Sequence, residues 1–173
     1  MGTALAPVFA PETLDFEALV HRHQAMVFSI ALRFLQDRSA AEELAQDVFL
    51  QLHRHLPAMQ SADHVTFWLR RVTTHRCIDY SRRRRFNFLR LESVPEPSAA
   101  VSVCDPLLSR RLRALIGKLP APARMAVILR YQEDLTPEEI ARVLDRPVAT
   151  VKSQLQRSLK TLKERLGKMV PHA

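Results

Sequence analysis

The chain has 173 residues, of which 47% are hydrophobic, so it is long and apolar enough for one ordinary domain or two small ones. With only three glycines, it does not suit a fold of tight β-turns or a glycine-rich nucleotide-binding loop. The net charge of +8 indicates a polyanionic partner, for which nucleic acid is the first possibility and an anionic membrane surface the second.

No stretch of the sequence predicts a secretory signal or a membrane span. The amino end lacks the basic residues that precede a signal core, and Pro7 and Pro11 interrupt its apolar residues. Cys77 and Cys104 are too few for a disulfide framework and lack the spacing of a metal site. We therefore expect a soluble, cytoplasmic protein with no membrane insertion.

The amino-terminal half predicts three helices, because apolar residues recur there at helical spacing. The first expected helix covers 15–35, with Thr13 as its cap, and the second covers 39–56 and is ended by Pro57. After a loop at 58–64, a third helix is expected to begin at Asp63 or Thr66 and to end after the arginines at 82–85.

The second expected helix carries a small acidic patch. Glu43, Gln46 and Asp47 lie at positions i, i+3 and i+4, which places them on one helix face. The opposite face carries the apolar stripe that we expect to be buried, at Leu44, Val48, Leu52 and Leu56. An acidic patch in a basic protein suits docking on a basic protein surface, although a merely solvated patch is the commoner alternative.

The third expected helix is strongly basic. Residues 70–90 contain eight arginines and one acid, Asp79, interleaved with aromatic residues. Basic side chains track phosphates and aromatic faces stack on unpaired bases, so this stretch predicts contact with nucleic acid. The alternative is that the arginines are a solvated helix end. We expect Trp68 to belong mostly to the core in either case.

A change of composition divides the chain. Residues 91–105 include Pro95 and Pro97, several small residues and no basic residue, which is typical of a linker. Helices are expected afterwards at 106–118, 122–132, 137–144 and 148–166. The predicted fold is therefore all-α, with two small helical domains, 12–90 and 106–168, joined by the flexible linker.

The last two expected helices form a helix-turn-helix. Thr136 and Glu139 have the spacing of a capping box, and Asp145 suits the left-handed geometry of a tight turn. The following helix is expected to bury an apolar stripe at Val151, Leu155, Leu159, Leu162 and Leu166. Its other side is polar and basic, a pattern typical of insertion into the major groove of DNA. The alternative is an antiparallel helical hairpin with a solvated face.

The order of these features resembles the extracytoplasmic-function sigma factors, which are bacterial promoter-specificity subunits of RNA polymerase. The run 39–49 (SAAEELAQDVF) is similar to the family's polymerase-binding helix, and 67–72 (FWLRRV) through Asp79-Tyr80 is similar to its helix for the minus-ten promoter element. Residues 119–155, with the TVKS run at 150–153, resemble its carboxyl-terminal domain. The resemblance covers residues 12–168 in the family's order.

The resemblance implies a role for three groups of residues. They are Glu43, Gln46 and Asp47 for binding the β′ clamp helices of polymerase; Arg70, Arg71, Thr74, His75, Arg82 and Arg83 for the minus-ten element; and Thr150, Lys152, Ser153, Gln156 and Arg157 for the minus-thirty-five element. His75 departs from the family, which often has asparagine there. The implied partners are bacterial core RNA polymerase, promoter DNA and an anti-sigma factor.

The sequence predicts no enzyme, cofactor or metal site. No catalytic triad, Cys–His pair or phosphate-binding loop is present in the sequence, and the pairs His21/His23 and His53/His55 lie two residues apart, on different helix faces. We expect a sigma factor that binds core RNA polymerase, directs it to specific promoters and assists promoter melting. The alternatives are a stand-alone regulator that binds duplex DNA through 134–166, or a protein whose charged faces serve only assembly.

Overall fold

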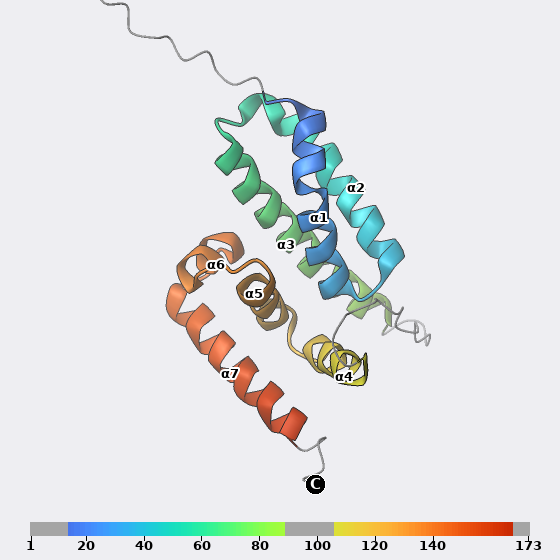
Figure 1. Cartoon of the computed structure of the whole chain (residues 1–173), viewed down its shortest axis with the longest axis vertical. Coiled ribbons are helices and arrows are strands. Elements are labelled where there is room, and N and C mark those ends of the chain that lie inside the picture. Colours follow the sequence, from blue (N-terminus) through green and yellow to red (C-terminus); the bar gives the residue numbers. More distant parts are fainter. Residues whose placement is uncertain (1–13, 89–105, 168–173) are drawn as a thin grey trace, which may run out of the picture.

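The computed structural model describes residues 14–88 and 106–167, and within these ranges it contains seven α-helices, one 3₁₀ turn and no strand (Figure 1). The elements are α1 (Phe16–Leu35), α2 (Arg38–His55), the 3₁₀ turn η1 (Leu56–Ala58), α3 (Ala62–Phe88), α4 (Pro106–Gly117), α5 (Ala121–Gln132), α6 (Pro137–Leu144) and α7 (Val148–Gly167). The predicted all-α fold is confirmed for these residues. The predicted linker 91–105, Thr13 and Cys104 lie outside them. No helix in the described ranges is long and apolar enough to cross a membrane.

The first three helices begin at side-chain caps. Asp15 accepts hydrogen bonds from two backbone N–H groups of the first turn of α1 at 3.1 and 3.3 Å, and Asp37 accepts one at the start of α2 at 3.1 Å. At α3, the hydroxyl of Ser61 accepts a backbone N–H at 3.1 Å. The prediction that Asp63 or Thr66 opens α3 is therefore wrong, because the short side chain of Ser61 already reaches the N–H three residues ahead.

Helices α1, α2 and α3 pack into a bundle in which α1 contacts both of the others. Its centre is wholly buried and includes Phe34 of α1, Leu52 of α2 and Leu69 of α3. The predicted apolar stripe of α2 is buried except at its last member, Leu56. This residue is half-buried because the chain changes there from α to 3₁₀ geometry.

Helices α5, α6 and α7 form the second group, and α4 packs against α7. Ile140 of α6 and Val151 of α7 are wholly buried at its centre. The predicted stripe of α7 is wrong at Leu159, which is 43% exposed, whereas Ser158 is 3% exposed. A period of 3.6 residues places Ser158 nearer than Leu159 to the middle of the stripe that runs from Val151 to Leu162.

The two groups of helices pack directly against each other. Helix α5 contacts α1 and α3, and α6 also contacts α3 (Figure 1). Buried residues of both groups form one continuous cluster. The sequence indicated no contact between the two halves of the chain, and this contact decides which of the predicted site residues reach solvent.

Candidate polymerase and nucleic-acid interfaces

The predicted docking patch on α2 faces solvent. Glu43, Gln46 and Asp47 are all exposed, and within the described residues neither carboxylate forms an ion pair. Leu50 is 59% exposed and lies three residues after Asp47, so it extends the same face. Sequence reasoning missed Leu50, although its spacing was the signal. Unpaired acids beside an exposed apolar side chain suit contact with another protein.

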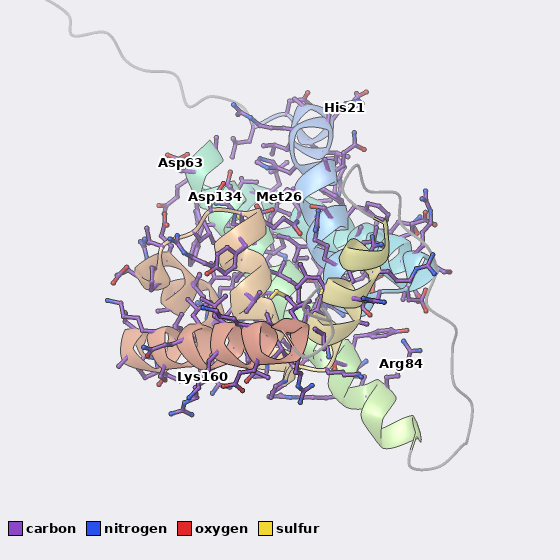
Figure 2. The ribbon with its side chains drawn as sticks, turned by 60° about the horizontal axis from the view of Figure 1, so that its bottom comes forward. His21, Met26, Asp63, Arg84, Asp134 and Lys160 are labelled. Carbon is purple, nitrogen blue, oxygen red and sulfur yellow. The ribbon has the colours of Figure 1, made fainter. Side chains whose placement is uncertain are left out.

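The basic face of α3 has an open part and a covered part. Arg82 and Arg83 are exposed towards the carboxyl end of the helix, next in sequence to Arg84 (Figure 2). The other four residues predicted for the minus-ten element lie earlier on α3, where the helix faces α5 and α6. We call these four the covered face: Thr74 is buried, Arg70 and Arg71 are half-buried, and His75 remains exposed.

Two arginines of the covered face meet carboxylates from the carboxyl-terminal group. Arg70 Nη2 lies 3.4 Å from Glu133 Oε2, directly after α5, and this pair is mostly shielded from solvent. Arg71 Nη2 lies 3.7 Å from Asp145 Oδ2, in the turn between α6 and α7, and this pair is more exposed. No local pattern in the sequence indicated either pair.

The rest of the covered face meets the carboxyl end of α6. Arg71 Nη1 donates a hydrogen bond to the carbonyl oxygen of Arg142 at 3.4 Å, and His75 Nε2 lies 3.3 Å from the carbonyl oxygen of Val143. Thr74 is wholly buried, and its hydroxyl has no hydrogen-bond partner among the described residues. In this arrangement Thr74 therefore has no access to DNA.

Three aromatic side chains of α3, Phe67, Trp68 and Tyr80, contribute more to packing than to an open stacking surface. Trp68 is half-buried against the core, and its ring centroid lies 5.6 Å from that of His55. Tyr80 is half-buried as well, whereas Phe67 is 37% exposed. Phe67 is thus the most accessible of these three rings for stacking on a base.

Helix α6, a tight turn and α7 form the predicted helix-turn-helix. The Thr136 hydroxyl accepts the backbone N–H of Glu139 at 3.2 Å, and the Thr136 N–H donates to the Glu139 carboxylate at 2.7 Å, so the capping box is confirmed. Hydrogen bonds from Thr136 lower the pKa of Glu139. Asp145 has a φ of 54°, and this left-handed residue closes α6 before α7 begins, as predicted.

The residues predicted to read the minus-thirty-five element lie along α7, as three exposed and two half-buried side chains. The exposed ones are Lys152, Gln156 and Arg157, and the half-buried ones are Thr150 and Ser153. Lys152 Nζ lies 2.9 Å from Glu138 Oε1 on α6, and the hydrogen bond lowers the pKa of Glu138. The exposed side chains form a polar, basic face of the kind that contacts DNA edges and phosphates.

The histidines and the buried cysteine do not form a reactive centre among the described residues. His21 is exposed and His23 is buried, so this pair does not converge, and no group of three metal-ligand side chains occurs in residues 14–88 and 106–167. Cys77 is wholly buried, as expected. Burial raises the pKa of its thiol to about 12, which disfavours the reactive thiolate.

Comparison with known proteins identifies the family. Residues 19–87 match the family "Sigma-70 region 2", and residues 109–162 match "Sigma-70, region 4". The chain is 30% identical over 156 residues to the RNA polymerase sigma-E factor of Streptomyces avermitilis, an alignment that covers 90% of this chain and 87% of that protein. The chain belongs to the extracytoplasmic-function group of sigma-70 factors. The resemblance drawn from the sequence is therefore confirmed.

Two further comparisons agree with this assignment. The chain is 32% identical over 165 residues to the sigma factor SigE of Mycolicibacterium smegmatis, covering 89% of this chain but only 62% of that relative's length. The fold matches that of the sigma factor RpoE, solved in complex with the anti-sigma factor NepR from Bartonella quintana, with a TM-score of 0.75 and 20% identity over 88% of this chain and 97% of that one. In the present chain, the region 2 match covers α2 and most of α1 and α3. The region 4 match covers α5, α6 and most of α4 and α7.

Proposed function

We propose that this sigma factor binds bacterial core RNA polymerase, directs it to specific promoters and assists promoter melting. The observation that carries the proposal is that one chain presents two chemically different open faces on the two matched regions. The α2 face of region 2 is acidic and forms no ion pair within the part of the chain that the structure describes, and the α7 face of region 4 is basic. A stand-alone DNA-binding regulator uses the second face and leaves the first without a role.

Each face has one proposed partner. Glu43, Gln46 and Asp47 would bind the clamp helices of the polymerase β′ subunit, because exposed acids complement a basic protein surface. The five α7 residues would read the minus-thirty-five element, and α3 would hold the opened minus-ten element through its arginines. Residues 12–90 and 106–168 would act as the two domains, with 91–105 as their linker. RNA synthesis itself would belong to the polymerase.

An anti-sigma factor is a further proposed partner. The solved sigma factor RpoE, which is similar in fold, is bound to the anti-sigma factor NepR. A protein that covers the α2 face of this chain would exclude polymerase from it. We place both the chain and such a partner in the cytoplasm, where the polymerase is.

Transcript mapping tests the proposed function. Purified chain is added to sigma-free bacterial core polymerase with genomic DNA fragments, and the RNA is sequenced, with core polymerase alone as the control. The expected result is a set of discrete new starts that share two upstream sequence elements. If the chain instead binds duplex DNA as a dimer at two-fold operators and does not bind polymerase, the stand-alone regulator replaces the proposal.

Arg157 is expected to set specificity at one upstream base. Replacing Arg157 by alanine should weaken promoter binding by about 1–3 kcal/mol if the guanidinium pairs with a base edge, and should relax the preference at that position. Promoter variants measured in competition provide the readout. Arg165→Ala, an exposed arginine in the last turn of the same helix, is the matched control. Equal losses across all sequences would identify Arg157 as a phosphate contact instead.

A further inference from the structure

A cavity of about 530 Å³ lies where four helices meet. Its wall takes residues from the end of α1, the carboxyl-terminal half of α3, the segment that joins α4 to α5, and the first turn of α5. The volume is within the range of small-molecule sites, about 300–1,000 Å³. No residue proposed above for contact with polymerase or DNA is among its described lining residues, so the proposed function leaves this cavity without a role.

The cavity wall is strongly basic. Arg84 of α3 (labelled in Figure 2), Lys118 after α4 and Arg124 of α5 line it, and no carboxylate does so among the described residues. Arg84 and Lys118 form no ion pair within those residues. The neighbouring acid on α3, Asp79, has its Oδ1 3.6 Å from Nη1 of Arg82 instead. A recess lined by one sign of charge concentrates ions of the other sign, so this cavity attracts anions.

Hydrogen-bond donors in the wall add to this charge. The Nε atom of Arg124 is buried without a hydrogen-bond partner among the described residues, although both Nη atoms donate to carbonyl oxygens. Tyr80 and Ser81 bring hydroxyl groups, and α5 begins at Ala121 without a side-chain cap. Backbone N–H groups in the first turn of a helix carry partial positive charge and commonly bind phosphate. The cavity thus combines cations with donors that suit the oxygens of an anion.

The rest of the wall is apolar and includes one ring that a ligand can reach. Phe34 is wholly buried, with the Arg124 guanidinium over its ring at 5.0 Å from the centroid, whereas Tyr80 is half-buried. Leu119 and Pro120 add apolar surface from the segment between α4 and α5. Aromatic rings stack on nucleobases, and guanidinium and ammonium groups bind phosphates. A ligand that carries both an anionic part and a flat apolar part therefore fits this wall.

We infer that this cavity binds a nucleoside polyphosphate, with the phosphate chain at Arg84 and Lys118 and the base against Tyr80. The inference goes beyond the proposed function, because it uses none of the residues assigned to polymerase or promoter DNA. A bare phosphate chain uses the cations and leaves the ring and the apolar wall uncovered. An uncharged aromatic molecule leaves the cations without a counter-charge. A nucleoside polyphosphate occupies both parts of the wall at once.

Two charge-matched double variants test the inference by calorimetric titration of the full chain. Arg84→Gln with Lys118→Gln removes two cations from the cavity and keeps Arg124 in place. The control, Arg111→Gln with Lys160→Gln, removes the same two residue types from exposed positions on α4 and α7 outside the described lining. Both variants lose the same net charge, so general attraction of anions to a basic protein falls equally. The titrants are ATP, GTP, inorganic triphosphate and adenosine, at about 0.15 M salt to screen weak surface contacts.

The glycines of the chain give a second, site-specific measurement. Only three glycines are present in the sequence, and Gly117 lines the cavity. Labelling with ¹⁵N-glycine therefore gives three backbone amide signals in a nuclear magnetic resonance spectrum. Gly2→Ala and Gly167→Ala, made one at a time, identify the signals by their loss, and a Cβ atom at 167 meets no neighbour within 4 Å. Movement of the Gly117 signal on addition of nucleotide reports binding at the cavity, with Gly167 at the end of α7 as the internal reference.

The expected result is that the parent chain binds ATP or GTP and that the cavity variant binds about thirtyfold more weakly, with the control within about twofold of the parent. Inorganic triphosphate should bind about tenfold more weakly than the nucleotides, and adenosine should not bind measurably. The Gly117 signal should move while the Gly167 signal stays. Ser81→Asp, which keeps all three cations and places a carboxylate three residues before Arg84, should show the same loss and serves if the double variant does not fold.

Three outcomes overturn the inference. The first is that the parent chain binds no nucleotide. The second is that the cavity variant binds nucleotide like the parent, or that nucleotide binds while the Gly117 signal stays, because binding then lies on the exposed basic faces. The third is equal affinity for inorganic triphosphate and the nucleotides, which removes the nucleoside from the assignment. None of these results bears on polymerase or promoter binding, so the proposed function is tested separately.

Discussion

Replacing Arg124 by methionine should lower the free energy of unfolding by about 3 kcal/mol, because one guanidinium donates hydrogen bonds to carbonyl oxygens at the ends of two helices. Arg124 Nη1 donates to the carbonyl oxygen of Phe34 near the end of α1 at 3.0 Å. Its Nη2 donates to the carbonyl oxygens of Gly117, the last residue of α4, and of Leu119 just beyond it, the latter at 3.2 Å. Without the arginine, these carbonyls lose a charged donor in a half-buried site.

The surroundings of Arg124 explain why no other side chain should fully restore the stability that its loss removes. The guanidinium also lies over the Phe34 ring, 5.0 Å from its centroid, and burial lowers its pKa. Lysine offers one compact ammonium and does not reach carbonyls in several directions, so Arg124→Lys should recover only part of the lost stability.

Urea denaturation followed by far-ultraviolet circular dichroism measures the effect. Arg111→Met, at an exposed position on α4, is the matched control and should change stability by less than about 0.5 kcal/mol. A loss for Arg124→Met no larger than that of the control would show that the three carbonyls are satisfied in another way. Since Arg124 joins α5 of region 4 to α1 of region 2, its loss should also loosen the contact between the regions.

Local features of this fold were predictable from the sequence, because their partners lie within one helical turn. The Thr136–Glu139 capping box and the left-handed Asp145 depend on neighbours three or four residues away. Helix ends were less predictable where two residues of suitable type lay close together. Ser61 and Asp63 both cap well, and only the backbone path decides which of them does.

The covering of α3 was not predictable from the sequence. Arg70 and Glu133 are 63 residues apart, and nothing in their local patterns links them. A threonine and a histidine among arginines predict an open polar face, whereas Thr74 is wholly buried on the helix that α5 and α6 contact. By contrast, the α2 face was predictable as exposed, because an amphipathic helix with one apolar stripe must present its other side to solvent.

The largest functional loss is expected from the α2 face. The triple substitution Glu43→Ala, Gln46→Ala and Asp47→Ala should weaken binding to core polymerase by about 100-fold, because it removes the two unpaired charges and the amide from the proposed interface. The fold should persist, since all three side chains are exposed and alanine is the best helix former. Circular dichroism of the variant checks this before binding is measured by fluorescence anisotropy.

A second triple variant tests whether the loss of binding is specific to the α2 face or follows from the removal of acidic groups in general. Glu17→Ala, Gln24→Ala and Asp63→Ala remove the same three side-chain types from exposed positions on α1 and α3, so net charge changes equally. This control should bind polymerase like the parent chain. The parent's affinity should also fall as salt rises, because an acidic face on a basic surface is screened. Equal binding by both triple variants would contradict the assignment of α2, and polymerase contact would then have to lie on another face of region 2 or on region 4.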